Sequence, residues 1–255
     1  MKYLTATHTD VGIRKKTNQD SVLVMEAETE SGNVLFAAVC DGMGGLAKGE
    51  VASAAVIRAY AKWFEEEFPT LYYSGITEDT LKRSMENLIF AMNAKISSYG
   101  RKNGVSLGTT VVALIITEDR FYCINVGDSR CYHITDVFTQ VTKDQTYVQR
   151  EMDMGRMTAE EAKVHPQRNV LLQCVGASEY IVPDFYSGEI NSDEVFMLCS
   201  DGYRHLIEPE EFYQYLNPNV ISEEGQMKEN IKYFTELNKY RREEDNISVV
   251  LVRTV

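Results

Sequence analysis

Two turns in this sequence are too short to contain a helix, and they constrain the fold more than any other feature. The letters TEDR separate the apolar runs Thr109–Thr117 and Phe121–Val126, and GDS separates the second run from Arg130–Ile134. Because a parallel crossover needs a dozen or more residues, these neighbours are expected to pair antiparallel. Enrichment in Val, Ile, Phe, Tyr and Thr predicts further strands at Tyr3–Thr7, Ser21–Ala27, Val34–Cys40, Glu194–Cys199 and Asn246–Arg253.

Long helices are predicted in blocks between these strands. Apolar residues at helical spacing mark a helix over Gly49–Phe68, which we expect Pro69 to stop. A capped start at Thr77 begins a second helix that reaches about Ser98, and a third runs from Ser222 to about Arg242. Strand runs interrupted by helix pairs indicate an α+β fold with antiparallel sheets covered by helices.

Composition indicates a single domain over 1–255, because no stretch of the 255 residues is typical of a linker. The net charge of −12 argues against binding nucleic acid or an anionic membrane. The five cysteines form no CxxC motif, and Cys40, Cys123 and Cys199 lie inside apolar runs. With no apolar signal-peptide core and no run of membrane-spanning length, we expect a soluble protein in the reducing cytoplasm.

The segment from about 142 to 176 differs from the rest of the chain. Two short helical pieces, Tyr147–Met154 and Thr158–Val164, are joined by Gly155 and Arg156. Because the segment is long for a connection, it is predicted to be a lid or recognition flap.

Five aspartates stand at the ends of predicted strands. Asp41, Asp128 and Asp201 follow apolar runs, whereas Asp20 and Asp245 precede them. Any one of these is compatible with an ordinary turn. Together they favour a cluster of carboxylates, and such a cluster is costly unless hard cations such as Mg²⁺ or Mn²⁺ neutralise it.

The glycine after Asp41 fits the same interpretation. Gly42 allows close backbone approach, so we predict that Asp41 bridges two metals with the Gly42 carbonyl beside it. Zinc is not favoured, because no two of the chain's four histidines show ligand spacing. The segment Gly42–Ala47 also matches a dinucleotide-binding fingerprint, but no second parallel strand follows the helix after it.

Several motifs together resemble one family. In order, NQDSVLV, VCDGMGGLAKGEVAS, GTTVVALII, INVGDSRCYHI, LLQCVGAS, LCSDGYRHLI and DNISVVLV are similar to the PPM-type metal-dependent serine/threonine protein phosphatases, the protein phosphatase 2C family, in its bacterial form. The resemblance implies a four-layer α-β-β-α sandwich of two antiparallel sheets flanked by helices. It also implies hydrolysis of phosphoserine and phosphothreonine in proteins, with two Mn²⁺ or Mg²⁺ ions.

The resemblance also implies roles for individual residues. Asp41 and the Gly42 carbonyl would hold one core ion, with Asp41 bridging to a second ion held by Asp201 and Asp245. Asp20 would bind metal-bound water, and Asp128 would help hold a third ion together with Asp201.

Two positions depart from the family pattern. Gln19 stands where the family usually has an acid, and Lys15 stands where it often has an arginine that contacts substrate phosphate, with Arg14 one residue earlier. Lysine supplies a point charge but no bidentate fork, so we expect Lys15, or Arg14 in its place, to contact the phosphate.

The resulting hypothesis is attack on phosphorus by a hydroxide shared between two cations, with Asp20, Asp41 and Lys15 as the catalytic residues. The alternative is a non-catalytic pseudophosphatase or regulatory scaffold of the same fold. The expected partner is a phosphoprotein substrate, with a serine/threonine kinase as its functional opponent by analogy, and the chain is expected to be a monomer.

Overall fold

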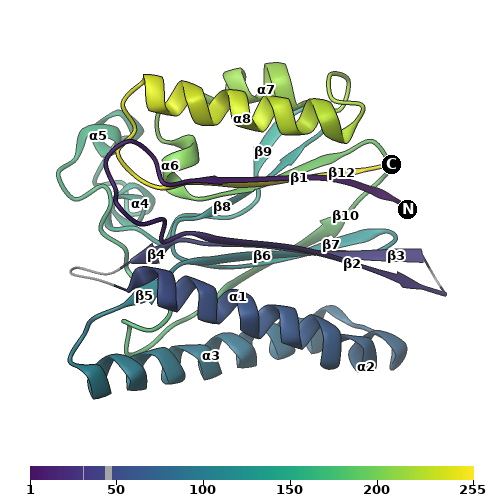
Figure 1. Ribbon diagram of the computed structural model, residues 1–255, viewed down its shortest axis with the longest axis horizontal. Coiled ribbons are helices and arrows are strands. Elements are labelled where there is room, and N and C mark those ends of the chain that lie inside the picture. The colour runs from purple at the N-terminus through teal and green to yellow at the C-terminus, as the bar shows by residue number, and fades with distance from the viewer. Residues whose placement is uncertain (31, 44–47) are drawn as a thin grey trace.

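Two five-stranded antiparallel sheets packed face to face form the centre of the molecule, and helices cover both outer faces (Figure 1). The computed structural model describes residues 1–30, 32–43 and 48–255. The predicted α+β class and the four-layer arrangement are confirmed.

The first sheet joins the two ends of the chain. Residue Tyr3 pairs with Thr254, and the termini lie side by side at one end of the molecule (Figure 1). The strand order in this sheet is β1 (Tyr3–Asp10), β12 (Ile247–Thr254), β11 (Val195–Cys199), β8 (Arg130–Ile134) and β9 (Phe138–Gln140).

The second sheet contains the most deeply buried strands. Its order is β10 (Asp184–Glu189), β7 (Arg120–Val126), β6 (Val111–Ile116), β3 (Gly32–Cys40) and β2 (Ser21–Thr29). Strand β6 is buried along its whole length because helices cover one face of this sheet and the first sheet covers the other. A small two-stranded ladder lies next to this sheet in the chain. Its strands are β4 (Gly42–Met43), which follows β3, and β5 (Gly108–Thr109), which precedes β6.

Each sheet has its own helical layer. Helices α1 (Gly49–Glu66), α2 (Phe68–Tyr73) and α3 (Glu78–Asn103) cover the second sheet, and α6 (Asp201–Arg204), α7 (Pro209–Leu216) and α8 (Glu224–Tyr240) cover the first (Figure 1). The two short helices predicted in the flap are present as α4 (Tyr147–Asp153) and α5 (Ala159–Val164).

Three apolar clusters hold these layers together. One fills the space between the sheets and includes Phe196 and Leu114. A second lies under α1 and α3, where Trp63 is almost completely buried, and a third lies under α8 around Phe234. The cysteines predicted as core residues, Cys40, Cys123 and Cys199, are all fully buried.

Some predicted boundaries were wrong. Pro69 does not stop the first helix, which ends at Glu66; it lies in the first turn of α2, where a missing backbone N–H costs nothing. Helix α3 continues past Ser98 to Asn103 and ends at Gly104, whose φ of 64° is the left-handed conformation typical of a C-cap. Strands β9 and β10 and helices α2, α6 and α7 were not predicted.

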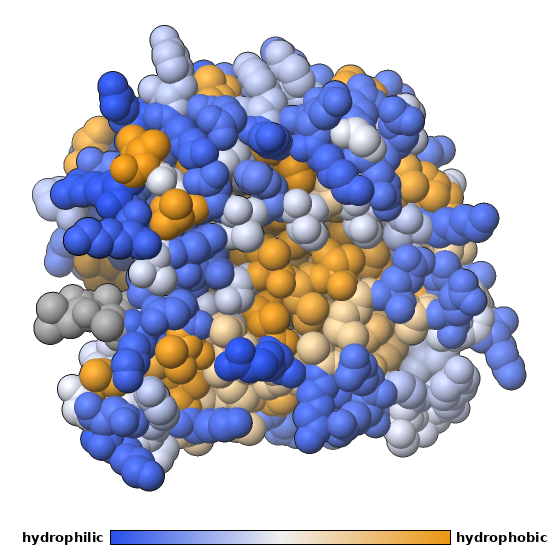
Figure 2. Space-filling model, viewed as in Figure 1, coloured by the Kyte–Doolittle hydropathy of each residue, from blue (hydrophilic) through white to orange (hydrophobic). Residues whose placement is uncertain are grey.

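The surface view shows the layers from outside. Hydrophilic residues gather over the helices, and an apolar band runs along the middle of the visible face, where the edge strands β1 and β2 lie (Figure 2). None of the described helices combines the length and apolar character needed to cross a membrane.

Candidate metal centre

The five aspartates predicted from the sequence come from both sheets and influence one another. Asp41 follows β3, Asp201 follows β11, and Asp128 follows β7, while Asp20 precedes β2 and Asp245 precedes β12. The pKa of Asp41 is raised well above its usual value, first because protein atoms surround its carboxyl and then because of the negative charges of the other four aspartates. The fold therefore brings these carboxyls to one end of the sandwich.

Hydrogen bonds from the strands beside it fix the backbone of Asp41. Its N–H donates to Thr110 Oγ1 at 3.0 Å, and its carbonyl accepts from the Thr110 N–H at 2.9 Å and from Thr109 Oγ1 at 2.8 Å. The Thr110 hydroxyl also lies 2.7 Å from that of Ser129. The GTT and GDS motifs thus position Asp41, which leaves Ser129 in a structural role.

Gly42 is required by close packing. A Cβ at this position would lie 2.3 Å from the Gly49 carbonyl oxygen and 2.5 Å from that of Gln19. Its φ is outside the left-handed region, so close packing and not a positive-φ turn accounts for the glycine. The rest of the glycine-rich stretch, residues 44–47 of the considered dinucleotide fingerprint, lies outside the described residues.

Buried carboxylate oxygens without partners fit hard cations. Ser200 Oγ donates to Asp20 Oδ2 at 2.9 Å, but Asp20 Oδ1 and Asp201 Oδ1 are buried and have no hydrogen-bond partner among the described residues. Burial raises the pKa of Asp20 to about 7, against the hydrogen bonds from Ser248 and Ser200 and with help from the charges of Asp201 and Asp245. Such oxygens are costly in a fold unless a cation or proton satisfies them, so this donor set suits Mg²⁺ or Mn²⁺.

Lys15 lies among these acids, whereas Arg14 does not. The Lys15 ammonium is 2.8 Å from Asp245 Oδ1, and Arg14 is paired with Glu244 at the surface. Burial lowers the pKa of Lys15, but its bond to Asp245 and the charges of Asp41 and Asp201 outweigh this and raise it overall.

Asn246 and Gly12 hold the loop that carries Lys15. Asn246 Nδ2 donates to the carbonyls of Val11 and Thr17, and its Oδ1 accepts the Gln19 N–H at 2.9 Å. Gly12 has a φ of 75°, and a Cβ there would lie 2.2 Å from the Asp245 carbonyl oxygen. Sequence reasoning missed Asn246, although its place directly after Asp245 was a signal.

Across residues 1–30, 32–43 and 48–255, no set of three or more His, Cys, Asp or Glu side chains is placed so that it could hold a metal ion as it stands. Asp245 is instead bonded to Lys15. Gln19, at the other departure from the family pattern, donates its side-chain amide to Glu50 at 3.3 Å.

A cleft of about 1040 Å³ opens beside the aspartates. It runs from Lys15 and Asp245 past Asp128 and under the flap, where α4 and α5 face α7. Substrate would therefore reach the acids between the flap and the first sheet's helical layer. Two of the four histidines lie away from the acids: His165 packs against Tyr147 in the flap, at 5.6 Å between ring centroids, and His133 pairs with Glu194.

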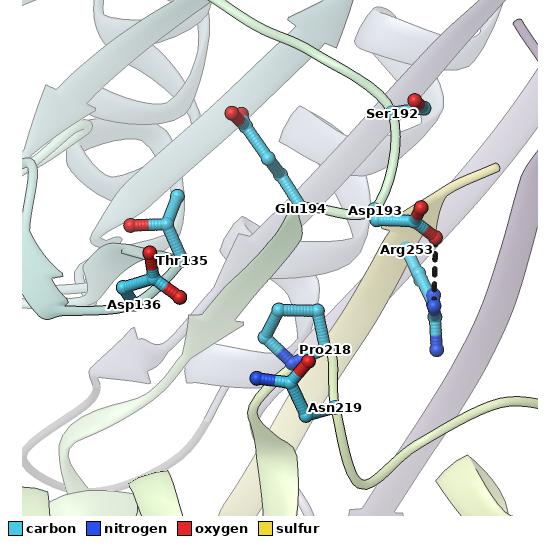
Figure 3. A pocket seen from close by; sticks show the side chains of 8 residues that line it. All are labelled: Thr135, Asp136, Ser192, Asp193, Glu194, Pro218, Asn219 and Arg253. Atoms are coloured by element: carbon cyan, nitrogen blue, oxygen red, sulfur yellow. Dashed lines mark hydrogen bonds and ion pairs between the residues drawn. The ribbon is translucent and has the colours of Figure 1, made fainter.

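A smaller hollow of about 380 Å³ lies at the opposite ends of β11 and β12 (Figure 3). Arg253 is paired there with Asp193 at 2.8 Å. Because Val195 pairs with Arg253 at one end of these strands and the proposed ligands Asp201 and Asp245 stand beyond the other end, this hollow is separate from the candidate metal centre.

The sequence and fold are similar to those of known bacterial phosphatases. The family model of protein phosphatase 2C matches residues 9–235. The chain is 30% identical over 250 residues to the serine/threonine phosphatase stp of Listeria innocua, which covers 96% of this chain and 93% of the relative. The crystal structure of serine/threonine phosphatase Stp1 from Staphylococcus aureus superposes with a TM-score of 0.86 at 27% identity, covering 100% of this chain and 96% of that one.

A second similar structure contains metal. It is the catalytic domain of the serine/threonine protein phosphatase PstP in complex with two manganese ions, with a TM-score of 0.79, 28% identity, and coverage of 99% of this chain and 98% of that one. The sandwich and the family match together define a metal-dependent phosphatase fold, and the chain belongs to the protein phosphatase 2C family. It is thus an enzyme of the protein phosphatase class.

Proposed function

We propose that this protein hydrolyses phosphoserine and phosphothreonine in proteins and that two divalent cations are held by Asp41, the Gly42 carbonyl, Asp201 and Asp245. The observation that supports this most directly is the pair of buried, unpartnered oxygens, Asp20 Oδ1 and Asp201 Oδ1, among the described acids. When bound, the cations would lower the pKa of water to supply a nucleophile and would offset the charge on the phosphoryl group. A similar phosphatase with two manganese ions in its crystal structure makes Mn²⁺ the first ion to test.

The chain's own residues would divide the work as follows. Asp41 would be a ligand of both ions, and the hydrogen bonds to its backbone keep its carboxyl in place. Asp20, whose Oδ2 is held by Ser200, orients water through its free Oδ1. Lys15 binds the substrate phosphate, since its ammonium is the cationic group placed against Asp245 at the cleft.

The test is turnover of a small aryl phosphate and of phosphoserine and phosphothreonine peptides with and without Mn²⁺. Asp41→Asn should lower kcat by about a thousandfold or more, because both ions lose their shared ligand. Asp193→Asn is the matched control, because that acid lies in the separate hollow, and it should leave kcat unchanged. Full turnover by the Asp41→Asn variant would overturn the metal assignment.

One observation favours the pseudophosphatase alternative. The Lys15 ammonium already provides Asp245 with a cationic partner, so a catalytically silent chain would need no metal there. Absence of Mn²⁺-dependent turnover on every phosphopeptide, together with retained binding of a phosphoprotein, would favour that scaffold role.

A further inference from the structure

Asp128, the acid expected to hold a third ion, already has a cationic partner in the chain. Arg204 Nη2 donates to the Asp128 backbone carbonyl at 2.9 Å and lies 3.7 Å from Asp128 Oδ2. Both side chains are about nine-tenths buried, at 9% and 10% exposed. Opposite charges this close in a buried site attract, so the guanidinium offsets part of the Asp128 charge.

Arg204 is also held by a second acid. Its Nη2 also lies 3.4 Å from Asp144 Oδ2, and Arg130 binds the two oxygens of Asp144 at 2.7 and 2.8 Å. Arg130 is in turn bonded to the Tyr132 hydroxyl at 2.9 Å. The bidentate pair of Arg130 with Asp144 fixes the Asp144 carboxylate. Asp144 in turn keeps the Arg204 guanidinium from turning freely away from Asp128.

Asp201, the other acid expected at a third ion, is also faced by a basic side chain. His205 Nε2 lies 3.5 Å from Asp201 Oδ2, and His205 Nδ1 lies 3.6 Å from Glu243 Oε2. Arg204 and His205 are consecutive residues at the end of α6. One short helix thus directs two nitrogen-bearing side chains at the two acids between which a third divalent ion would lie.

The third site therefore does not fit a cation as the core site does. Asp20 and Asp201 each keep a buried oxygen without a partner among the described residues. Asp245 and Asp128 both face a cation, but the Lys15 side chain is 40% exposed, whereas that of Arg204 is 9% exposed and bonded to the Asp128 carbonyl. A dication bound to Asp128 would lie close to the fixed positive charge of Arg204 and be repelled by it.

From this we infer that Arg204 takes the electrostatic place of a third divalent ion, so that this chain loads two cations and leaves Asp128 without one. The inference rests on the proposed function, because it presupposes the two core ions. Arg204 is a positioning residue here: it holds the Asp128 carbonyl and joins Asp128 to Asp144 at the start of the flap.

The test is the number of Mn²⁺ ions bound per chain, measured by titrating the full-length protein with Mn²⁺ and following the free ion by electron paramagnetic resonance. Wild-type protein should bind two ions, and Asp128→Asn, which is nearly isosteric, should give the same curve. A third ion in the wild type that Asp128→Asn removes would overturn the inference while leaving the proposed function standing. If the wild type binds no Mn²⁺, both the proposed function and the inference fail.

Removing the arginine should create the missing site. Arg204→Met should gain a third Mn²⁺, bound about tenfold or more tightly than at the same place in the wild type, because the nearby positive charge is gone. The double variant Arg204→Met/Asp128→Asn should lose that ion again. Arg130→Met is the matched control: it removes the other arginine on Asp144 but leaves Arg204 bonded to the Asp128 carbonyl, and it should stay at two ions.

The number of Mn²⁺ ions bound per chain separates this role of Arg204 from a merely structural role. Loss of a buried arginine would lower stability in either case, so thermal unfolding should accompany each titration. A folded Arg204→Met protein that still binds two ions would overturn the inference. If that variant does not fold, the comparison of the wild type with Asp128→Asn decides.

Discussion

Lys15 is the residue whose position most affects how substrate would bind. Its ammonium is bonded to Asp245, a proposed metal ligand, and both line the cleft. When a dication occupies the core, Asp245 would have a stronger partner, and Lys15 would be left free to contact a phosphate at the same place. Lys15 would thus pair with Asp245 in the metal-free protein and with the substrate phosphate in the metal-bound protein.

Exchanging Lys15 tests this directly. Lys15→Ala should raise KM for a phosphopeptide by about tenfold, since a hydrogen bond to a charged group contributes roughly 1.5–3 kcal/mol. Lys15→Arg should restore the wild-type KM. Arg14→Ala, one residue away and paired with Glu244 at the surface, is the control and should change KM little. Steady-state kinetics at saturating Mn²⁺ measures all three; a larger KM for Arg14→Ala than for Lys15→Ala would reverse the assignment.

Sequence reasoning reached the acids of the site but not the residues that hold them. Apolar runs that end in aspartate can be recognised in the sequence, because a buried strand is a continuous run of hydrophobic residues. Ser200, Asn246 and Arg204 act through hydrogen bonds to atoms far away in the chain, and no local pattern marks such a partner. Their roles depend on how the two sheets are placed, which a one-dimensional pattern does not contain.

At the scale of elements, the strands covered on both faces were predictable, whereas two of the four edge strands, β9 and β10, were not. Strand β3 is nearly all buried, so its sequence is one apolar run. Strands β9 and β10 lie at the edges of their sheets, and neither contains a fully buried residue. Short, half-exposed edges need little hydrophobic patterning, which is why β9, with three residues, left no signal.

Capping at Thr77 offers a test of one element in isolation. The Thr77 side chain accepts from the Thr80 N–H, and the Thr80 side chain accepts from the Thr77 N–H, which satisfies two free donors at the start of α3. Thr77→Ala should lower the free energy of unfolding by about 1 kcal/mol. Urea titration should show a lower midpoint with the same slope.

The matched variant for this cap is Thr77→Ser, which keeps the hydroxyl and should retain most of the stability. The kcat value should be unchanged in both variants, because this helix start does not line the cleft. Equal destabilisation by serine and alanine would show that packing of the threonine methyl group, not the cap, is responsible.

At the scale of the whole molecule, the candidate metal centre depends on both sheets at once. Asp20 and Asp41 flank strands of the second sheet, and Asp201 and Asp245 flank strands of the first. Without cations, the acids gathered there oppose the packing of the two sheets, because each carboxyl raises the cost of ionising the others. Bound cations should therefore stabilise the whole sandwich as well as the site.

The metal-free protein should consequently become less stable as pH rises. In the folded chain the pKa of Asp20 is about 7, against its usual 3.8, so the folded state holds a proton that the unfolded state has already released between these values. Stability from this group is complete below about pH 4 and is lost as pH rises toward 7. In EDTA, the wild-type Tm should fall by roughly 5 °C or more from pH 5 to pH 7.5.

Asp20→Asn isolates this contribution, because an amide does not titrate and the remaining groups are unchanged. Its Tm in EDTA should fall less over the same pH interval than the wild-type Tm, and Asp193→Asn should follow the wild type. Adding Mn²⁺ at pH 7.5 should raise the wild-type Tm, since the ion binds the folded state, and Asp41→Asn should abolish most of that rise. Parallel pH curves for the wild type and Asp20→Asn would show that the Asp20 carboxyl is not held protonated in the fold, and the account of strained acids at the end of the sandwich would then be wrong.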